Sequence, residues 1–339
     1  MFLVAEEVGE SPDEGYAKVV VELGRAMSRR ATVITHLTRA DGAGSRIQVG
    51  LRRMGAVVNR KLRTELMQAG PSTVVYMSRS SVTLSALVRS RMLKWMVGGG
   101  RVVMIALQPR SMGWPGRLAS RLLWPDLLLV STDDERRGIE GLGATVDRMV
   151  TGVDLDRFRP AKPGEKTALR RKWGIPGDTS VVLHVGHLTD GRNLEALLPL
   201  TAQPGLTVVV VASSQRHSEA ARLEQRLRAS GVVLIQGFIA DIDEMYRLAD
   251  CYVFPTMSTD YAIAMPLSIL EAIASDLPVA AMRFGALPER FGDTDGVLLV
   301  ENASELVDGV LELLRDRPST RRLSERYSWA AVADQVVAS

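Results

Sequence analysis

Short runs of valine, isoleucine and leucine alternate with amphipathic stretches along almost the whole chain. Most runs are continuously apolar, which is typical of strands buried on both faces of a parallel sheet. Strands are predicted at Met1–Ala5, Ala31–Thr35, Thr73–Met77, Arg101–Leu107, Leu127–Ser131, Val181–Val185, Thr207–Ala212, Val232–Gln236, Cys251–Pro255, Pro278–Met282 and Gly296–Val300. Helices are predicted between them, for example at Ala17–Arg29, Glu219–Ala229, Asp243–Ala249 and Ser304–Arg315. This rhythm predicts an α/β fold with doubly wound parallel sheets.

The rhythm is interrupted over Thr151–Ser180, where prolines and glycines gather as in a linker. A chain of 339 residues is also too long for one compact core of ordinary size. We therefore predict two Rossmann-like domains facing across a cleft, the first over residues 1–150.

The composition, with 46% hydrophobic and 24% charged residues, is that of a soluble globular protein. The apolar runs are shorter than the roughly 20 residues of a membrane span, and the first residues lack the basic and apolar regions of a signal peptide. The single cysteine, Cys251, fits a reducing compartment. We expect a cytoplasmic protein.

Positive charge is concentrated in the first half of the chain. Residues 1–150 hold 22 Lys/Arg against 14 Asp/Glu, whereas the remainder holds 20 against 25. Between Arg46 and Arg121, 14 basic residues face one acid, Glu65, and tryptophans such as Trp95 and Trp114 are interleaved with them. Such a face suits an anionic membrane surface or a nucleic acid, and a solvated arginine-rich exterior explains it equally well. We favour the inner face of a membrane as partner and expect no nucleic acid.

Ligands of parallel sheets bind beyond the carboxyl ends of the strands, where loops lead into helix N-termini. Residues 186–193 follow a predicted strand, and a helix is predicted to open at Leu194. Gly186 allows close approach of the backbone to a ligand, and His187 and Arg192 could each contact a phosphate. Asn193 could cap the following helix. An ordinary strand–loop–helix connection contains such residues as well, so a purely structural interpretation stays open.

A second loop, residues 255–266, leads from a buried strand to a helix predicted to begin near Pro266. The backbone N–H groups of Leu267 and Ser268 would be unpaired there and available to a diphosphate. Glu271, about one turn later, would accept hydrogen bonds from ribose hydroxyls. A glutamate near a helix start also stabilises the helix dipole without any ligand.

Several segments form a recognisable set of motifs. They are Asp13-Glu14-Gly15-Tyr16, Gly152-Val153-Asp154-Leu155-Asp156-Arg157-Phe158-Arg159-Pro160, Val185-Gly186-His187-Leu188 with Arg192, Gly237 with Asp241, Ala249-Asp250 with Pro255, Leu270-Glu271-Ala272, Gly285-Ala286-Leu287-Pro288-Glu289 and Tyr327-Ser328-Trp329. In these motifs the chain resembles the retaining GT-B glycosyltransferases of the glycosyltransferase group 1 family. The resemblance covers nearly the whole chain and is strongest from Leu127 to Ala280.

The resemblance implies an acceptor-side domain over residues 1–150, a nucleotide-sugar domain over 151–320 and a closing helix over 321–339 that returns toward the first domain. It implies sugar transfer with retention of configuration from a nucleotide-diphosphate sugar to a glycan or lipid-linked acceptor. Neither a metal nor a cofactor beyond this co-substrate is expected.

The resemblance also assigns roles to residues. The donor would be held by Gly186, His187, Arg192, Asn193, Gly237, Phe238, Leu267, Ser268 and Glu271, with Phe238 near the nucleobase and Glu271 on the ribose. Glu14, Gly15 and Tyr16 would contact acceptor and donor phosphate. Arg192, His187 and Gln108 are the expected catalytic residues, because a leaving diphosphate develops negative charge that a guanidinium and a protonated imidazole stabilise.

Three positions depart from the family pattern. Ile263 stands where a first glutamate is usual, Gln108 where many members have a histidine, and His187 where arginine is usual. A second hypothesis is therefore a degenerate member that binds a nucleotide sugar or acts as a scaffold without turnover. A third, a Rossmann-type oxidoreductase, is disfavoured because Gly141-Leu142-Gly143 lacks the third glycine of a dinucleotide fingerprint.

Overall fold

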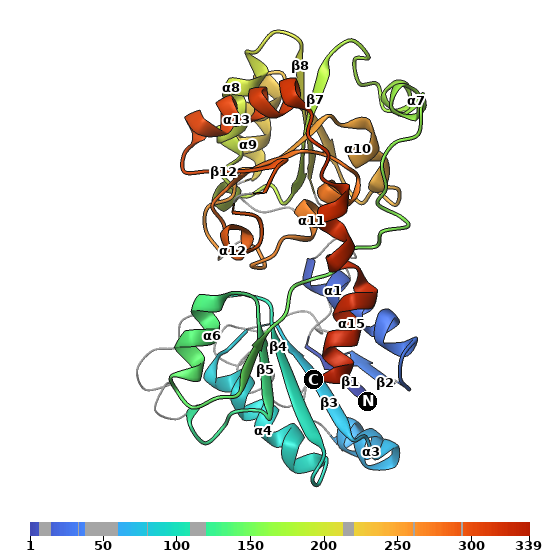
Figure 1. Cartoon of the computed structure of the whole chain (residues 1–339), viewed down its shortest axis with the longest axis vertical. Helices are drawn as coiled ribbons and strands as arrows, with labels where there is room; N and C mark the ends of the chain where they lie inside the picture. Colours follow the sequence, from blue (N-terminus) through green and yellow to red (C-terminus); the bar gives the residue numbers. More distant parts are fainter. Residues whose placement is uncertain are drawn as a thin grey trace. The chain divides into compact units, whose positions relative to one another are not determined.

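The computed structural model divides the chain into two compact units (Figure 1). Unit 1 comprises Met1–Val150 together with Trp329–Ser339, and unit 2 comprises Thr151–Ser328. The structure describes residues 1–6, 15–32, 34–37, 60–79, 81–108, 120–212, 220–259, 262–292 and 294–339. Each unit carries a six-stranded parallel sheet with helices, which confirms the predicted α/β fold with two Rossmann-like domains.

The sheet of unit 1 has the order β2-β1-β3-β4-β5-β6. Its strands are β1 (Phe2–Ala5), β2 (Ile34–Leu37), β3 (Thr73–Ser78), β4 (Arg101–Ala106), β5 (Leu127–Val130) and β6 (Val146–Arg148). Its helices are α1 (Gly15–Ser28), α3 (Arg60–Ala69), α4 (Leu84–Met96), α6 (Asp133–Glu140) and α15 (Trp329–Ala338). The edge strand β6 was not predicted, because three residues that include Asp147 and Arg148 form no apolar run.

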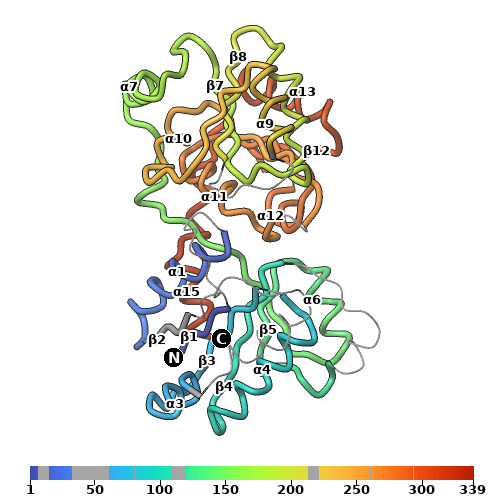
Figure 2. The backbone as a smooth tube through the Cα atoms, turned by 180° about the vertical axis from the view of Figure 1, so that it is seen from behind, coloured from blue at the N-terminus to red at the C-terminus, as the bar shows by residue number. Residues whose placement is uncertain are grey.

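Alternate residues of the unit 1 strands face one core. Phe2, Val74 and Val102 pack in one buried cluster with Leu62 of α3 and Leu87 of α4, as the two-residue period of a strand requires. The helix α15 lies beside α1 in both views (Figures 1 and 2). This last helix of the chain therefore belongs to the packing of the first unit.

The sheet of unit 2 has the order β12-β11-β10-β7-β8-β9. Its strands are β7 (Ser180–Gly186), β8 (Leu206–Ala212), β9 (Val233–Gln236), β10 (Cys251–Phe254), β11 (Val279–Met282) and β12 (Val297–Val300). Its helices are α7 (Glu165–Lys172), α8 (Leu198–Thr201), α9 (Ala220–Ala229), α10 (Asp243–Leu248), α11 (Leu267–Ala274), α12 (Leu287–Phe291), α13 (Ala303–Asp316) and α14 (Arg321–Ser324). Short 3-10 turns lie at Asp190–Arg192, Leu194–Leu197 and Glu325–Tyr327.

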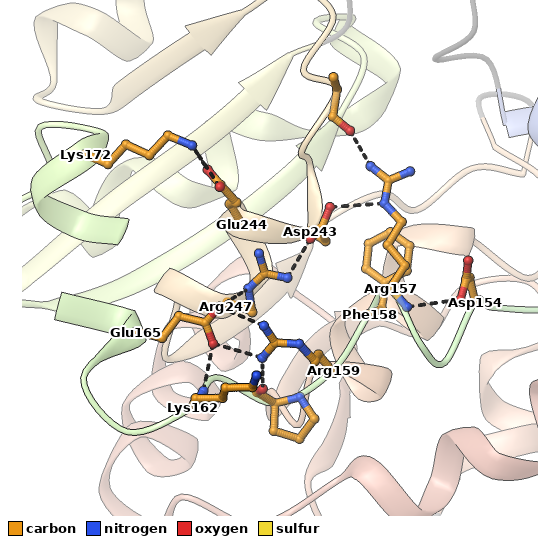
Figure 3. Close-up of polar contacts among 12 residues, drawn as sticks. Asp154, Arg157, Phe158, Arg159, Lys162, Glu165, Lys172, Asp243, Glu244 and Arg247 are labelled. Carbon is orange, nitrogen blue, oxygen red and sulfur yellow. Dashed lines mark hydrogen bonds and ion pairs between the residues drawn. The ribbon is translucent and has the colours of Figure 1, made fainter. Parts of the chain in front are cut away.

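The predicted linker over residues 151–180 is a folded part of unit 2, since it contains α7 and is tied to α10 by ion pairs (Figure 3). Glu165 pairs with Arg159 at 2.8 Å and with Arg247 at 3.1 Å. Asp243 bridges Arg157 at 3.0 Å and Arg247 at 2.5 Å. The hydrogen bond from Arg159 is the main reason that the pKa of Glu165 falls to about 2. Proline and glycine here mark turns around α7 rather than a free connection.

Candidate functional site

The candidate site of unit 2 is built where β7 and β10, neighbours in the sheet, end near the start of α11. Gly186 is the last residue of β7, and Pro266 is the N-cap of α11, with φ −64° and ψ 129°. Leu267 and Ser268 are the first two residues of this helix, so their backbone N–H groups have no intrahelical acceptor. The predicted helix start at Pro266 is thus confirmed.

Arg192 is the most unusual charge of this site. It is only 8% exposed, and its Nε has no hydrogen-bond partner among the described residues. Burial lowers the pKa of its guanidinium, yet an arginine keeps its charge in proteins. A buried charge without a counter-ion is costly, so the position favours an anionic ligand.

The phenol of Tyr252 links Arg192 to α11. It donates a hydrogen bond of 3.3 Å to the carbonyl of Val185 and accepts one from Ser268. Burial, the largest effect, raises the pKa of Tyr252; the charge of Glu271 raises this pKa further, and the charge of Arg192 lowers it. The phenol therefore stays neutral and lies within electrostatic range of both charges.

Glu271 is held inside the unit by a second tyrosine. Its side chain is buried, with 6% exposure, and its Oε2 accepts a hydrogen bond of 2.7 Å from the Tyr246 hydroxyl. The rings of Tyr246 and Tyr252 stack at 5.8 Å between centroids. This aromatic pair fixes the carboxylate in one orientation, as recognition of a hydroxyl-bearing ligand requires.

Three further polar atoms, which lie near Arg192 in the chain or on or just after the neighbouring strands β7 and β10, have no hydrogen-bond partner among the described residues. These buried atoms are His184 Nε2, Thr189 Oγ1 and Thr256 Oγ1. The Nδ1 of His184 lies 3.0 Å from the Val253 carbonyl and donates to it, which leaves Nε2 as an acceptor. Burial lowers the pKa of His184 to about 4. None of the three was among the residues expected from the sequence, because only tertiary packing shows which hydroxyls and ring nitrogens remain unpaired.

The loop after β7 differs from its prediction in two ways. Two 3-10 turns and the short α8 replace the helix expected from Leu194. Asn193 makes no capping bond; it has φ 56°, and its Nδ2 donates a 3.1 Å hydrogen bond to the Pro255 carbonyl. Through this hydrogen bond Asn193 joins the two site loops.

The remaining donor-side residues are spread over the same edge of the sheet. His187 is half-buried in the loop between Gly186 and Arg192. Gly237 follows β9 with φ 117°, and Phe238 is 58% exposed. Because β8 separates β9 from β7, these two residues lie apart from the Arg192–Tyr252–Glu271 group.

The candidates of unit 1 are divided between described and undescribed residues. Glu14 lies outside the described residues, and Gly15 begins α1. The Tyr16 hydroxyl donates 2.8 Å to the Met77 carbonyl and accepts 3.1 Å from the Glu6 amide, so it serves internal structure. Gln108 follows β4, where its carbonyl accepts a hydrogen bond from Ser81.

Sequence reasoning also missed a buried charged cluster in unit 1. Glu6 directly follows β1 and pairs with Arg89 at 2.6 Å between Oε1 and Nε. Arg89 also donates 2.9 Å to the Tyr76 hydroxyl, and the amide of Arg79 donates 3.3 Å to Glu6. In the sequence, only the position of Glu6 at the end of a predicted strand pointed to a functional or buried charge. Its ion-pair partner, Arg89 of α4, is brought beside it by the fold.

Two kinds of structural feature are absent from the described ranges. No group of histidine, cysteine, aspartate and glutamate there has the arrangement of a metal site. No helix there is both long and apolar enough to span a bilayer.

Comparisons with known proteins give both family and fold relationships. Residues 165–328 match the family described as glycosyl transferases group 1. A D-inositol 3-phosphate glycosyltransferase of Corynebacterium aurimucosum is 30% identical over 239 residues, which cover 62% of this chain and 55% of that protein. A second such enzyme, from Catenulispora acidiphila, is 31% identical over 240 residues, which cover 61% and 54%. The chain thus spans about half the length of the curated relatives it matches.

Solved structures match over the whole chain. Anabaena Alr3699/HepE in complex with UDP has a TM-score of 0.76 and 16% identity, covering 99% of this chain and 98% of that one. Sucrose-phosphate synthase from Thermosynechococcus elongatus has a TM-score of 0.77 and 16% identity, covering 100% and 98%. At this identity the likeness shows the fold alone.

Proposed function

We propose that this chain transfers a sugar from a nucleotide-diphosphate donor to an acceptor. Its residues 165–328 place it in the glycosyl transferases group 1, and it has the GT-B fold. The observation that carries the proposal is the buried Arg192 guanidinium, which has no counter-ion among the described residues. A diphosphate supplies two negative phosphoryl groups and suits such a position. Structures of similar fold have been solved with UDP and with UDP-glucose, which supports a nucleotide sugar as the donor.

The site residues have complementary roles in this reaction. The bond between the sugar and the diphosphate breaks, and negative charge grows on the departing phosphate oxygen. Arg192 and the first amides of α11, at Leu267 and Ser268, stabilise that charge. Glu271, fixed by Tyr246, accepts hydrogen bonds from the ribose.

We propose retention of configuration without a metal. The departing phosphate takes the proton of the acceptor hydroxyl while that oxygen bonds to the sugar carbon on the same face. No second protein carboxylate is needed in this scheme, in contrast to glycoside hydrolysis. His187 and Gln108 are the further catalytic candidates, and Gly186, Asn193, Gly237 and Phe238 complete the proposed donor site.

The acceptor is proposed to be a glycan or a lipid-linked acceptor bound by unit 1 through Glu14 and Gly15, of which Gly15 begins α1. Tyr16, also expected there, is not part of this proposal, because its hydroxyl is bound to Met77 and Glu6 within unit 1. The two relatives described above are named for a phosphorylated inositol, which supports a hydroxyl-rich acceptor. The reaction is placed in the cytoplasm, at the inner face of the membrane. The buried free thiol of Cys251 fits that compartment.

Calorimetric titration with UDP-, GDP- and ADP-sugars tests donor binding. The Arg192→Met variant is expected to bind the preferred nucleotide about 10- to 100-fold more weakly, because hydrogen bonds to a charged group are lost. Arg222→Met, at an exposed position of α9, is the control and should bind like the wild type. Equal affinity of both variants would remove Arg192 from the donor site.

A second candidate function is nucleotide-sugar binding without turnover. The half-buried Ile263 favours it, since an apolar side chain stands where the family pattern has a glutamate. Release of free nucleotide, followed with and without acceptors, separates the two functions. Tight binding without any release from all three donor classes would support the second function.

A further inference from the structure

Helix α4 is apolar on two opposite faces. Its inner face, with Ala86, Leu87 and Leu93, is buried in the core of unit 1. The outer face repeats apolar residues at the spacing of a helical stripe, and its members are Leu84 (41% exposed), the half-buried Val88, Met92 (37%) and Trp95 (70%). The core explains the burial of the inner face, whereas the outer face remains largely exposed.

The neighbouring helix α3 extends this outer face. Met67 of α3 is 66% exposed, and the Arg63 guanidinium lies 5.4 Å from the centre of the Trp95 ring. Of the nine large hydrophobic residues exposed in the described part of the chain, four lie on these two helices. Because soluble proteins rarely gather such residues without a partner, the cluster indicates an interaction surface.

The charges around the stripe are positive. The sequences of α3 and α4 hold six Lys/Arg against one acid, Glu65. Arg89 alone of the α4 cations is buried, in the ion pair with Glu6, while Arg91 is exposed and the Lys61 side chain is 79% exposed. A hollow of about 460 Å³ is lined by Arg91, Met92, Lys94 and Trp95. Lys94 is ion-paired with Asp126, so the exposed Arg91 is the cation that lies beside Met92 and Trp95.

We infer that this α3–α4 face, defined by Lys61, Arg63, Met67, Arg91, Met92 and Trp95, docks onto an anionic lipid surface. A helix lying on a bilayer places aliphatic and tryptophan side chains among the acyl boundaries and its cations among the headgroups. The face has both elements at the required spacing, and its net charge attracts acidic lipids. The proposed function includes a membrane partner, and the α3–α4 face is the surface that would contact it. This contact does not depend on donor binding.

Flotation with vesicles tests the inference. The wild-type chain should bind vesicles of phosphatidylcholine mixed with phosphatidylglycerol, and binding should weaken at high salt and on phosphatidylcholine alone. The double variants Met92→Ser/Trp95→Ser and Lys61→Glu/Arg91→Glu should each bind about tenfold less. Leu311→Ser and Arg222→Glu, exposed positions of unit 2, are the matched controls and should bind like the wild type.

The outcomes separate this inference from the donor site. All α3–α4 variants should keep the melting temperature and the nucleotide affinity of the wild type, whereas Arg192→Met should bind vesicles normally. Equal vesicle binding by the variants and controls would overturn the inference. It would also be overturned by a dimer in sedimentation that Trp95→Ser dissociates, or by preferential binding of single-stranded DNA over the acidic vesicles.

Discussion

The imidazole Nε2 of His184 lies 2.8 Å from the position that a Cβ of Gly186 would occupy. The Nη1 of Arg192 lies 3.8 Å from the same point. Glycine is thus required at the end of β7 because the space that a side chain would fill is already bordered by a fixed imidazole and a guanidinium.

Gly186→Ala is expected to destabilise the protein by about 1–3 kcal/mol, since the added methyl group must displace the buried His184 ring. The same shift should weaken nucleotide binding. Urea unfolding and calorimetric titration measure the two effects. Gly177→Ala is the matched control, because a Cβ there meets nothing within 4 Å; equal stability of both variants would contradict the crowding at Gly186.

Replacing Arg192 is expected to separate stability from binding. Without ligand, Arg192→Met should raise the free energy of unfolding by about 1 kcal/mol or more, because an uncompensated buried charge is removed. The same nucleotide concentration should then stabilise the wild type more than the variant. Thermal unfolding with and without nucleotide shows both effects.

Arg170→Met provides the contrasting case. Arg170 is as buried as Arg192, at 7% exposure, but it pairs with Asp250 and donates 3.0 Å hydrogen bonds to the carbonyls of Leu248 and Thr179. Its replacement should cost about 1–3 kcal/mol, since hydrogen bonds to a charged group are lost while Asp250 keeps Lys166 at 2.8 Å. If the two arginine variants lose stability alike, Arg192 has a structural partner after all.

His184 should make stability depend on pH. Burial lowers the pKa of its imidazole to about 4 in the folded protein, against about 6.5 in an unfolded chain. Between these values the unfolded state binds more protons, so the free energy of unfolding should fall as pH falls from about 6.5 to 4, by up to about 3 kcal/mol.

His184→Phe keeps a ring between Tyr252 and Phe254 and should remove that part of the pH dependence. Chemical denaturation at a series of pH values gives the comparison. An unchanged slope in the variant would assign the pH dependence to other groups.

The Tyr246–Glu271 hydrogen bond is expected to contribute to stability and to donor affinity. Tyr246→Phe removes the 2.7 Å bond and leaves a buried carboxylate oxygen without that donor, which should cost about 1–3 kcal/mol. A double-mutant cycle with Glu271→Gln isolates the coupling between the two side chains. A coupling energy near zero would show that the phenol does not position Glu271.

The fold followed from the sequence because burial on both faces leaves a clear pattern. Strands such as Thr207–Ala212 and Cys251–Pro255 are apolar throughout and are found within one residue of their predicted bounds. Elements that depend on tertiary contacts were missed. The edge strand β6 has no apolar run, and α7 is held by the ion pairs of Glu165 rather than by an apolar stripe.

The site was predictable in its residue types but not in its geometry. A loop after a buried strand indicated Arg192, and the proline before α11 indicated Leu267 and Ser268. The sequence could not show that Arg192 is buried with no counter-ion in the described part of the chain, because acidic residues such as Asp190 lie beside it in the chain. Only the packing of β7 against β10 decides which groups remain unpaired.

The helix α15 has a consequence for biosynthesis. Its buried residues, Trp329, Val332, Ala333 and Val336, complete unit 1 although the whole of unit 2 separates them from it in the chain. A ribosome therefore releases every residue of unit 2 before the final piece of unit 1 emerges. Residues 1–150 are therefore synthesised with the α15 side of α1 uncovered, and the second unit can reach its native state before the first is complete.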